Sequence, residues 1–216
     1  MREKRVEFFS DELRLEGILE IAKTKEDSET ITSGPGVVLC HPHSLYGGRM
    51  DNNVTQAVSI ALGKRGISAL RFNFRGVEGS EGSFDEGEGE TRDALAAISF
   101  LASQEVVAPS RVGVMGYSFG GAVALTAGIY SKEVKAAAAV APAGLPRFEE
   151  NDIPRLIICG SEDEIVSIEA LLQEEEDIKG PSGAGSIEIV QGADHFWWGF
   201  EEQIAGRIAD FFVEHL

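Results

Sequence analysis

A strand, a tight turn and a helix follow one another directly between residues 112 and 127, and this stretch constrains the fold more than any other. The turn, residues 116–120, has the sequence Gly-Tyr-Ser-Phe-Gly. A serine on such a turn takes strained backbone angles, so the positions two before and two after it must lack bulk, and both are glycine here. The turn lifts the hydroxyl clear of the sheet edge, beside the unpaired N–H groups of the helix start. These features predict a nucleophile at Ser118.

Other functions of a glycine-rich strand-to-helix turn can be tested against the sequence. A dinucleotide-binding turn needs glycine where Ser118 stands, and it needs an acid closing the next strand, where residues 136–142 are Ala-Ala-Ala-Ala-Val-Ala-Pro. A phosphate-binding P-loop needs a Gly-Lys-Ser/Thr ending, which this turn lacks. The turn alone does not exclude a glycine-rich turn whose serine has no catalytic role, and the choice depends on the rest of the sequence.

Short apolar runs alternate with helical patterns along the chain. Residues 2–9 and 12–22 predict an antiparallel hairpin, and residues 24–36 predict a polar loop. Further strands are expected at 37–40, 68–74, 111–115, 135–141, 155–159 and 186–190, and helices near 51–64, 89–103, 118–130, 166–175 and 199–215. This alternation predicts an α/β fold with a mostly parallel sheet of about eight strands and helices on both faces. We expect one domain over residues 1–216, without a cap, because the connection from 141 to 155 is too short for one.

Charge and composition limit the partners and the compartment. The formal net charge is −17, which argues against nucleic acid and anionic membrane as partners. The acidic run from Glu78 to Glu90 lacks the ligand spacing of a calcium loop, so a solvated loop is the preferred interpretation over a cation site. No apolar run approaches a membrane span and no signal peptide is visible, so we expect a cytoplasmic protein. Cys40 and Cys159 end apolar strands and are expected to be buried free thiols.

A serine nucleophile needs a base within hydrogen-bond reach and an acid that orients the base. Asp163 and His195 each follow a predicted strand, and the carboxyl ends of parallel strands share one edge of the sheet. Asp194 is the alternative acid, but adjacent side chains at an extended strand end point apart, which favours Asp163. His41 and His43 could join His195 as metal ligands, but Pro42 between them and the lack of a following His-x-His-x-Asp pattern argue against it. We therefore expect neither a metal nor an organic cofactor.

Four motifs together carry a resemblance to a known family. They are His-Pro-His-x-Leu-Tyr-Gly-Gly at 41–48, Arg-Phe-Asn-Phe-Arg-Gly-x-x-x-Ser-x-Gly-x-Phe at 71–84, Gly-x-Ser-x-Gly at 116–120 and Gly-Ala-Asp-His-Phe at 192–196. With them the chain, from about residue 5 to its end, resembles the α/β-hydrolase superfamily, and within it the small, lidless, dienelactone-hydrolase-like group. Dienelactone hydrolases proper use a cysteine where this chain has Ser118, and this departure indicates ordinary ester chemistry.

The resemblance also implies where an oxyanion would be held. One donor is expected to be the N–H of Phe119, directly after the nucleophile, and the other to come from the loop that follows the strand 37–40. Pro42 has no N–H, so His43 is the preferred second donor and Leu45 the reserve. The substrate pocket is expected to be walled by Leu45, Tyr46, Phe196, Trp197 and Trp198.

The expected activity is that of a carboxylesterase that cleaves short-chain esters through an acyl-enzyme on Ser118. A small-molecule ester is then the partner, and the protein is expected to be a monomer or a homodimer. Amide or thioester cleavage by the same three residues is the first alternative. A non-catalytic binding protein of the same fold is the second, and the joint presence of Ser118, Asp163 and His195 argues against it.

Overall fold

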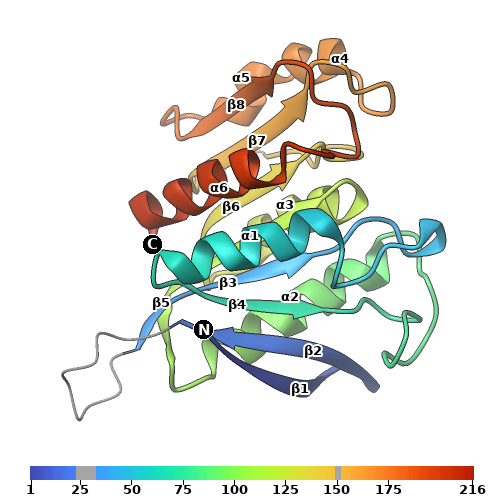
Figure 1. Ribbon diagram of the computed structural model, residues 1–216, viewed down its shortest axis with the longest axis vertical. Coiled ribbons are helices and arrows are strands. Elements are labelled where there is room, and N and C mark those ends of the chain that lie inside the picture. The colour runs from blue at the N-terminus through green and yellow to red at the C-terminus, as the bar shows by residue number, and fades with distance from the viewer. Residues whose placement is uncertain (23–32, 149–151) are drawn as a thin grey trace.

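The computed structural model describes residues 1–22, 33–148 and 152–216. Eight strands form a single sheet in the order β1-β2-β4-β3-β5-β6-β7-β8 (Figure 1). The strands are β1 (Arg2–Ser10), β2 (Leu13–Ile21), β3 (Gly34–Cys40), β4 (Ser68–Phe72), β5 (Val107–Tyr117), β6 (Val134–Val140), β7 (Arg155–Gly160) and β8 (Gly185–Val190). β2 is antiparallel to both of its neighbours, and the pairs from β4 to β8 are all parallel. This is the α/β-hydrolase fold without a lid.

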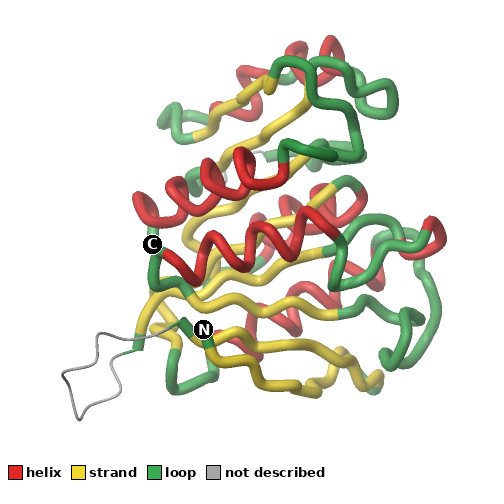
Figure 2. Tube along the Cα trace, viewed as in Figure 1, coloured by secondary structure: helices red, strands yellow, loops and turns green. Residues whose placement is uncertain are grey.

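Helices cover both faces of the sheet (Figure 2), and the central strands are therefore buried on both sides. The helices are α1 (Asn53–Lys64), α2 (Glu88–Ala102), α3 (Phe119–Tyr130), α4 (Ile168–Gln173), α5 (Glu175–Lys179) and α6 (Glu201–His215), with a short 3₁₀ helix η1 (Ser44–Tyr46). α1 and α6 pack on one face of the sheet, and α2, α3, α4 and α5 contribute to the core on the other face. On α6, Ile204, Ile208 and Phe212 recur every four residues and form the buried stripe of an amphipathic helix.

The structure differs from the sequence-based expectation in a few local places. The helix expected near 166–175 is two short helices, because Glu174 leaves the helical conformation and ends α4. β5 begins four residues early, at Val107, which pairs with Gly34 at the start of β3. The loop expected over 24–36 lies mostly outside the described residues, and positions 34–36 already belong to β3.

Two smaller expectations concern the cysteines and membrane spans. Cys40 and Cys159 are buried and free, as expected. Burial raises the pKa of the Cys159 thiol to about 12 and also raises that of Cys40, so both thiols stay protonated at neutral pH. Among the described helices, none is both long enough and apolar enough to span a bilayer.

Candidate active site

The turn between β5 and α3 holds Ser118 in a strained conformation, with φ 54° and ψ −121°. Two glycines make this turn possible. A Cβ added to Gly116 would lie 1.9 Å from the carbonyl oxygen of Gly120, and one added to Gly120 would lie 2.2 Å from that of His41. No side chain fits at either position, so the glycine spacing read from the sequence is a steric requirement of this turn.

Ser118, His195 and Asp163 form one chain of hydrogen bonds at the carboxyl edge of the sheet. The Ser118 Oγ lies 2.9 Å from Nε2 of His195, and Nδ1 of His195 lies 2.8 Å from Oδ2 of Asp163. The three residues follow β5, β8 and β7, three strands whose carboxyl ends meet at this edge (Figure 1). The Asp163 side chain is 0% exposed and that of His195 is 8% exposed, so water does not compete strongly for these bonds.

The two aspartates near His195 have different partners. Asp163 accepts hydrogen bonds from the N–H groups of Ile165 and Val166 through Oδ1, which leaves Oδ2 facing the imidazole. Asp194 instead accepts the N–H groups of Phe196 and Trp197 through its own Oδ1. Asp163 is therefore the carboxylate in contact with the ring, and Asp194 shapes the turn that carries the ring.

A tyrosine that the sequence interpretation did not single out also holds the histidine loop. The Tyr117 hydroxyl donates a 2.6 Å hydrogen bond to the carbonyl oxygen of His195. Burial raises the pKa of this phenol above its ordinary value, and the nearby carboxylates of Asp163 and Asp194 raise it further, so the hydroxyl keeps its proton. Tyr117 stands directly before the nucleophile, and its place inside the turn was the available signal.

The two candidate oxyanion donors of the loop after β3 differ in their hydrogen bonding. The Leu45 N–H donates to Nδ1 of the His43 side chain, at 3.2 Å. The His43 N–H donates to no residue that the structure describes. Phe119 is the first residue of α3, so its N–H has no partner in a preceding turn of the helix. His43 and Phe119 thus keep backbone donors beside Ser118, whereas that of Leu45 is occupied.

The metal arrangement considered from the sequence does not form. Both ring nitrogens of His41 have backbone partners, namely the Phe74 nitrogen and the Pro42 carbonyl oxygen. The imidazole of His195 faces Ser118 and Asp163. Across the described ranges, no group of three or more His, Cys, Asp or Glu side chains is arranged to hold a metal ion.

A cleft of about 610 Å³ opens over Ser118 and His195. Its walls are Pro42, His43, Tyr46, Gly47, Gly48, Asn52, Tyr117, Phe119, Ala143, Ile165 and Phe196. Tyr46 and Phe196 were expected there. Asn52, Tyr117, Ala143 and Ile165 were missed, although Ile165 follows Asp163 by only two residues.

Three residues expected in the cleft lie elsewhere. Trp197 is 0% exposed and packs in the core beside α6, because the turn capped by Asp194 and a φ of 64° direct its side chain inward. Leu45 is 69% exposed and Trp198 is 71% exposed, and neither lines the cleft. The assignment of Leu45, Trp197 and Trp198 to the pocket is therefore wrong.

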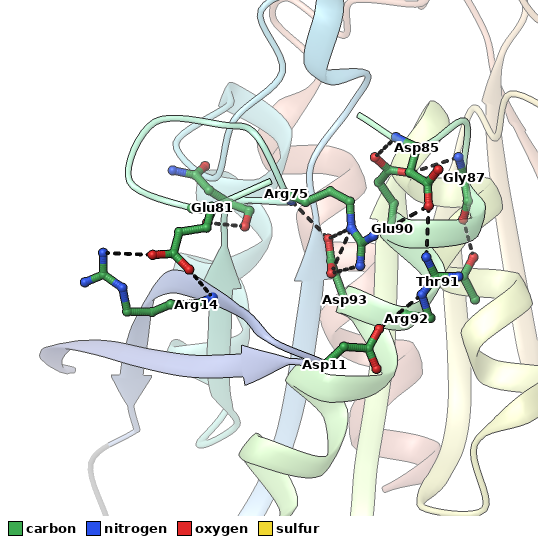
Figure 3. A network of polar contacts seen from close by, with 12 residues as sticks. Asp11, Arg14, Arg75, Glu81, Asp85, Gly87, Glu90, Thr91, Arg92 and Asp93 are labelled. Carbon is green, nitrogen blue, oxygen red and sulfur yellow. Dashed lines mark hydrogen bonds and ion pairs between the residues drawn. The ribbon is translucent and has the colours of Figure 1, made fainter. Parts of the chain in front are cut away.

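The acidic segment after β4 is ordered by arginines, so its interpretation as a simple solvated loop is incomplete (Figure 3). The buried Arg75 guanidinium donates hydrogen bonds of 2.8 to 3.2 Å to both carboxylate oxygens of Asp93 in α2. It also lies 3.5 Å from the carboxylate of Asp85. Glu90 accepts the N–H groups of Asp85 and Gly87 and so closes the segment onto the start of α2. Carboxylates of the acidic segment, such as those of Asp85 and Glu90, thus act as hydrogen-bond acceptors and ion-pair partners within the protein.

This ordering matters for the site because it brings Phe84 against His43 in the loop after β3. The Phe84 ring stacks on the imidazole of His43, with centroids 4.7 Å apart. Phe119 contacts the same imidazole at 4.9 Å, and Tyr46 contacts it at 4.8 Å. One side of the cleft is therefore an aromatic cluster of four rings, and Phe84, the last residue of the second sequence motif, supports it from outside.

The fold and the hydrogen-bonded chain of serine, histidine and aspartate define a class of protein: this chain is an α/β serine hydrolase without a lid. The sequence profile of the Dienelactone hydrolase family matches residues 81–206, which is more than half of the chain. The chain belongs to that family.

The chain is also similar to individual proteins. An uncharacterised protein of Rickettsia prowazekii is 32% identical over 85% of this chain and 81% of its own length. The crystal structure of a lidless α/β serine hydrolase of Xanthomonas campestris superimposes with a TM-score of 0.83 at 27% identity, over 99% of this chain and 95% of that one. The thiohydrolase aneE of Aspergillus aculeatus is 29% identical over 69% of this chain, which spans 44% of that protein's length.

Proposed function

We propose that the protein is a carboxylesterase that hydrolyses esters of short acyl chains through an acyl-enzyme on Ser118. The observation that carries this proposal is the continuous hydrogen-bonded chain from the Ser118 Oγ through His195 to the buried carboxylate of Asp163. The hydroxyl lies 2.9 Å from the imidazole that can act as its base, and the imidazole lies 2.8 Å from the carboxylate that orients it. This is the arrangement that activates serine for acyl transfer.

The reaction follows from this geometry in two halves. In the first, His195 takes the Ser118 proton, Oγ attacks the ester carbonyl, and the protonated ring then gives its proton to the leaving alcohol. In the second, His195 takes a proton from a water molecule as its oxygen attacks the acyl-enzyme carbonyl. The protonated ring then gives that proton back to the Ser118 Oγ as the bond to the acyl group breaks and the acid leaves. In both halves the carbonyl oxygen becomes negative beside the N–H groups of Phe119 and His43, each of which we expect to lower the barrier by about 3 kcal/mol.

The open cleft supports a substrate with a short acyl chain. Tyr46, Phe119, Ile165 and Phe196 give it an apolar lining near Ser118. Each methylene buried there contributes about 0.8 kcal/mol. Once a chain leaves the cleft it lies in water and gains nothing further, so preference should peak at roughly two to six acyl carbons.

Thioester hydrolysis is the second candidate, and the similarity to a fungal thiohydrolase favours it. The same three residues serve either reaction, because a thioester presents the same carbonyl to Ser118 and a better leaving group. Matched p-nitrophenyl, thioester and anilide derivatives of one short acid, assayed side by side, distinguish the candidates by their relative kcat/KM.

The nucleophile is tested by Ser118→Ala and by a fluorophosphonate. The variant should lose activity by several orders of magnitude at unchanged thermal stability, and the probe should add one phosphonyl group at Ser118, read by peptide mass spectrometry. Labelling at another residue, or full activity of Ser118→Ala, would remove the basis of the proposal. A non-catalytic binding protein would show neither turnover nor labelling.

A further inference from the structure

The imidazole of His41 is fully buried just after β3, and both of its nitrogens are hydrogen bonded. Nε2 lies 3.1 Å from the backbone nitrogen of Phe74, and Nδ1 lies 2.6 Å from the carbonyl oxygen of Pro42. A backbone N–H can only donate and a carbonyl oxygen can only accept, so Nε2 is the acceptor and Nδ1 carries the proton. The two bonds thus specify one neutral tautomer between them.

The ring is also kept neutral and fixed in place. Burial lowers the pKa of His41 to about 4, so it carries no charge at neutral pH. The Phe74 ring packs edge-on against it at 4.7 Å between centroids. Because Phe74 follows β4, the His41 side chain links the carboxyl ends of two neighbouring strands and is a rigid part of the scaffold under the site.

The bond from Nδ1 determines which way the next peptide faces. The carbonyl oxygen of Pro42 and the N–H of His43 belong to the same peptide unit, and a trans peptide places these two groups on opposite sides. No cis peptide occurs in the described part of the chain. Since the carbonyl is turned inward to the buried ring, the His43 N–H is turned away from the core, toward the cleft that Pro42 and His43 line.

Gly48 confines the same carbonyl from another direction. A Cβ added to Gly48 would lie 2.0 Å from the Pro42 oxygen and 2.8 Å from that of His43. The Gly48 N–H also donates to the His43 carbonyl, which closes the loop on itself. The Pro42–His43 peptide is therefore held by a hydrogen bond from His41 and by the backbone contact of Gly48.

We propose that His41 is a positioning residue whose Nδ1–H bond to Pro42 aims the His43 N–H at the oxyanion formed on Ser118. His41 touches neither the substrate nor the nucleophile, and it acts only through the peptide that it orients. An N–H aimed before the substrate arrives needs no reorganisation when the carbonyl oxygen becomes negative, which is the condition under which such a donor is most effective. The inference rests on the proposed function, since it requires acyl transfer at Ser118.

Two amide substitutions separate the two hydrogen bonds of the ring. Asn at position 41 places an NH₂ group near the position of Nδ1 and can keep the bond to Pro42, whereas Gln places an oxygen near Nε2 and can keep only the bond from Phe74. The measurements are kcat and KM for p-nitrophenyl butyrate, the inhibition constant of an alkylboronate, and the thermal midpoint. The boronate forms a tetrahedral adduct with Ser118 that places an oxygen where the oxyanion forms.

Misaiming one oxyanion donor should lower kcat by roughly ten- to a hundredfold in His41→Gln, with KM changed by less than about threefold. The inhibition constant of the boronate should rise by the same factor as kcat falls. His41→Asn should recover most of that loss, although both variants give up one hydrogen bond of the ring. Equal losses in the two variants, or a kcat of His41→Gln within about threefold of the wild type, would overturn the inference.

Gly48→Ala provides a second test that leaves the imidazole intact. The added methyl group presses on the Pro42 carbonyl, so it should lower kcat and weaken the boronate without raising KM in proportion. An unchanged kcat in this variant would also overturn the inference, even if both His41 variants failed to fold. If Ser118→Ala abolishes turnover while Gly48→Ala and His41→Gln behave as the wild type, the positioning role fails and the esterase proposal stands.

Discussion

Replacement of Asp163 by asparagine tests the assignment of the acid with almost no change in shape. The Asn oxygen can still accept the N–H groups of Ile165 and Val166 at the position of Oδ1, so the turn should keep its conformation. The NH₂ group then takes the position of Oδ2, 2.8 Å from Nδ1 of His195. Because an amide NH₂ only donates, Nδ1 can bond to it only as an acceptor, and the proton must move to Nε2.

That tautomer is wrong for catalysis, since a protonated Nε2 cannot take the proton from Ser118. To react, the ring must return to the Nδ1–H form, in which two donors face each other at a position where the side chain of residue 163 is 0% exposed. Losing a charge-assisted hydrogen bond costs about 1.5–3 kcal/mol, and leaving a buried donor unpaired costs about 1–3 kcal/mol more. The sum of about 2.5–6 kcal/mol corresponds to a fall in kcat of roughly 10²- to 10⁴-fold.

Asp194→Asn is the matched control. The asparagine oxygen can keep the hydrogen bonds from Phe196 and Trp197, and the ring nitrogens of His195 bond to Ser118 and Asp163 instead of residue 194. Both variants are assayed for kcat/KM with p-nitrophenyl butyrate, with Ser118→Ala as the background, and their thermal midpoints are compared. We expect the Asp194 variant to stay within about tenfold of the wild type. A larger loss from Asp194→Asn than from Asp163→Asn would refute the assignment of the acid.

Three further predictions concern substrates and pH. Across p-nitrophenyl esters of rising acyl length, kcat/KM should peak at roughly two to six carbons, and a maximum at long chains or a jump in rate at an oil–water interface would contradict the open cleft. Neutral esters should be better substrates than carboxylated ones of equal size, with a gap that narrows as salt is added, because the net charge is −17. The pKa of His41 is about 4 in the folded protein and about 6.5 in the unfolded chain, so the unfolded chain binds a proton first as the pH falls. Between about pH 6.5 and pH 4 this difference should lower the free energy of unfolding by about 3 kcal/mol. His41→Asn should lack that part of the pH dependence in urea unfolding, and an unchanged slope would contradict the buried neutral ring.

The proximity of Ser118, Asp163 and His195 could be predicted because it depends mainly on topology. Each residue follows a strand in the parallel part of the sheet, and the carboxyl ends of such strands share one edge. The alternation of strands and helices along the chain and the turn with its two glycines were therefore enough to predict that the three residues lie at one edge.

The walls of the cleft could not be predicted in the same way, because they depend on where individual loop side chains point. Trp197 and Phe196 are adjacent, yet one is in the core and the other lines the cleft. Their directions follow from the φ of 64° at Trp197 and from the hydrogen bonds to Asp194, and neither leaves a periodic signal in the sequence. The composition of the acidic segment likewise gave no indication that Arg75 would order it and so place Phe84 against His43.

The surface beside the base bears on the choice between ester and thioester, because acyl transfer at Ser118 is the same for both. A second hollow, of about 450 Å³, adjoins the cleft and shares Ile165, His195 and Phe196 with it. Glu162, Glu164 and Asp194 complete its lining, so a leaving group that departs past the imidazole meets carboxylates on that side. A polyanionic alcohol or thiol is repelled there, whereas a neutral one is not. If the proposed acyl transfer holds, we therefore expect uncharged leaving groups to be preferred among esters and thioesters alike, as measured by kcat/KM with matched charged and neutral leaving groups.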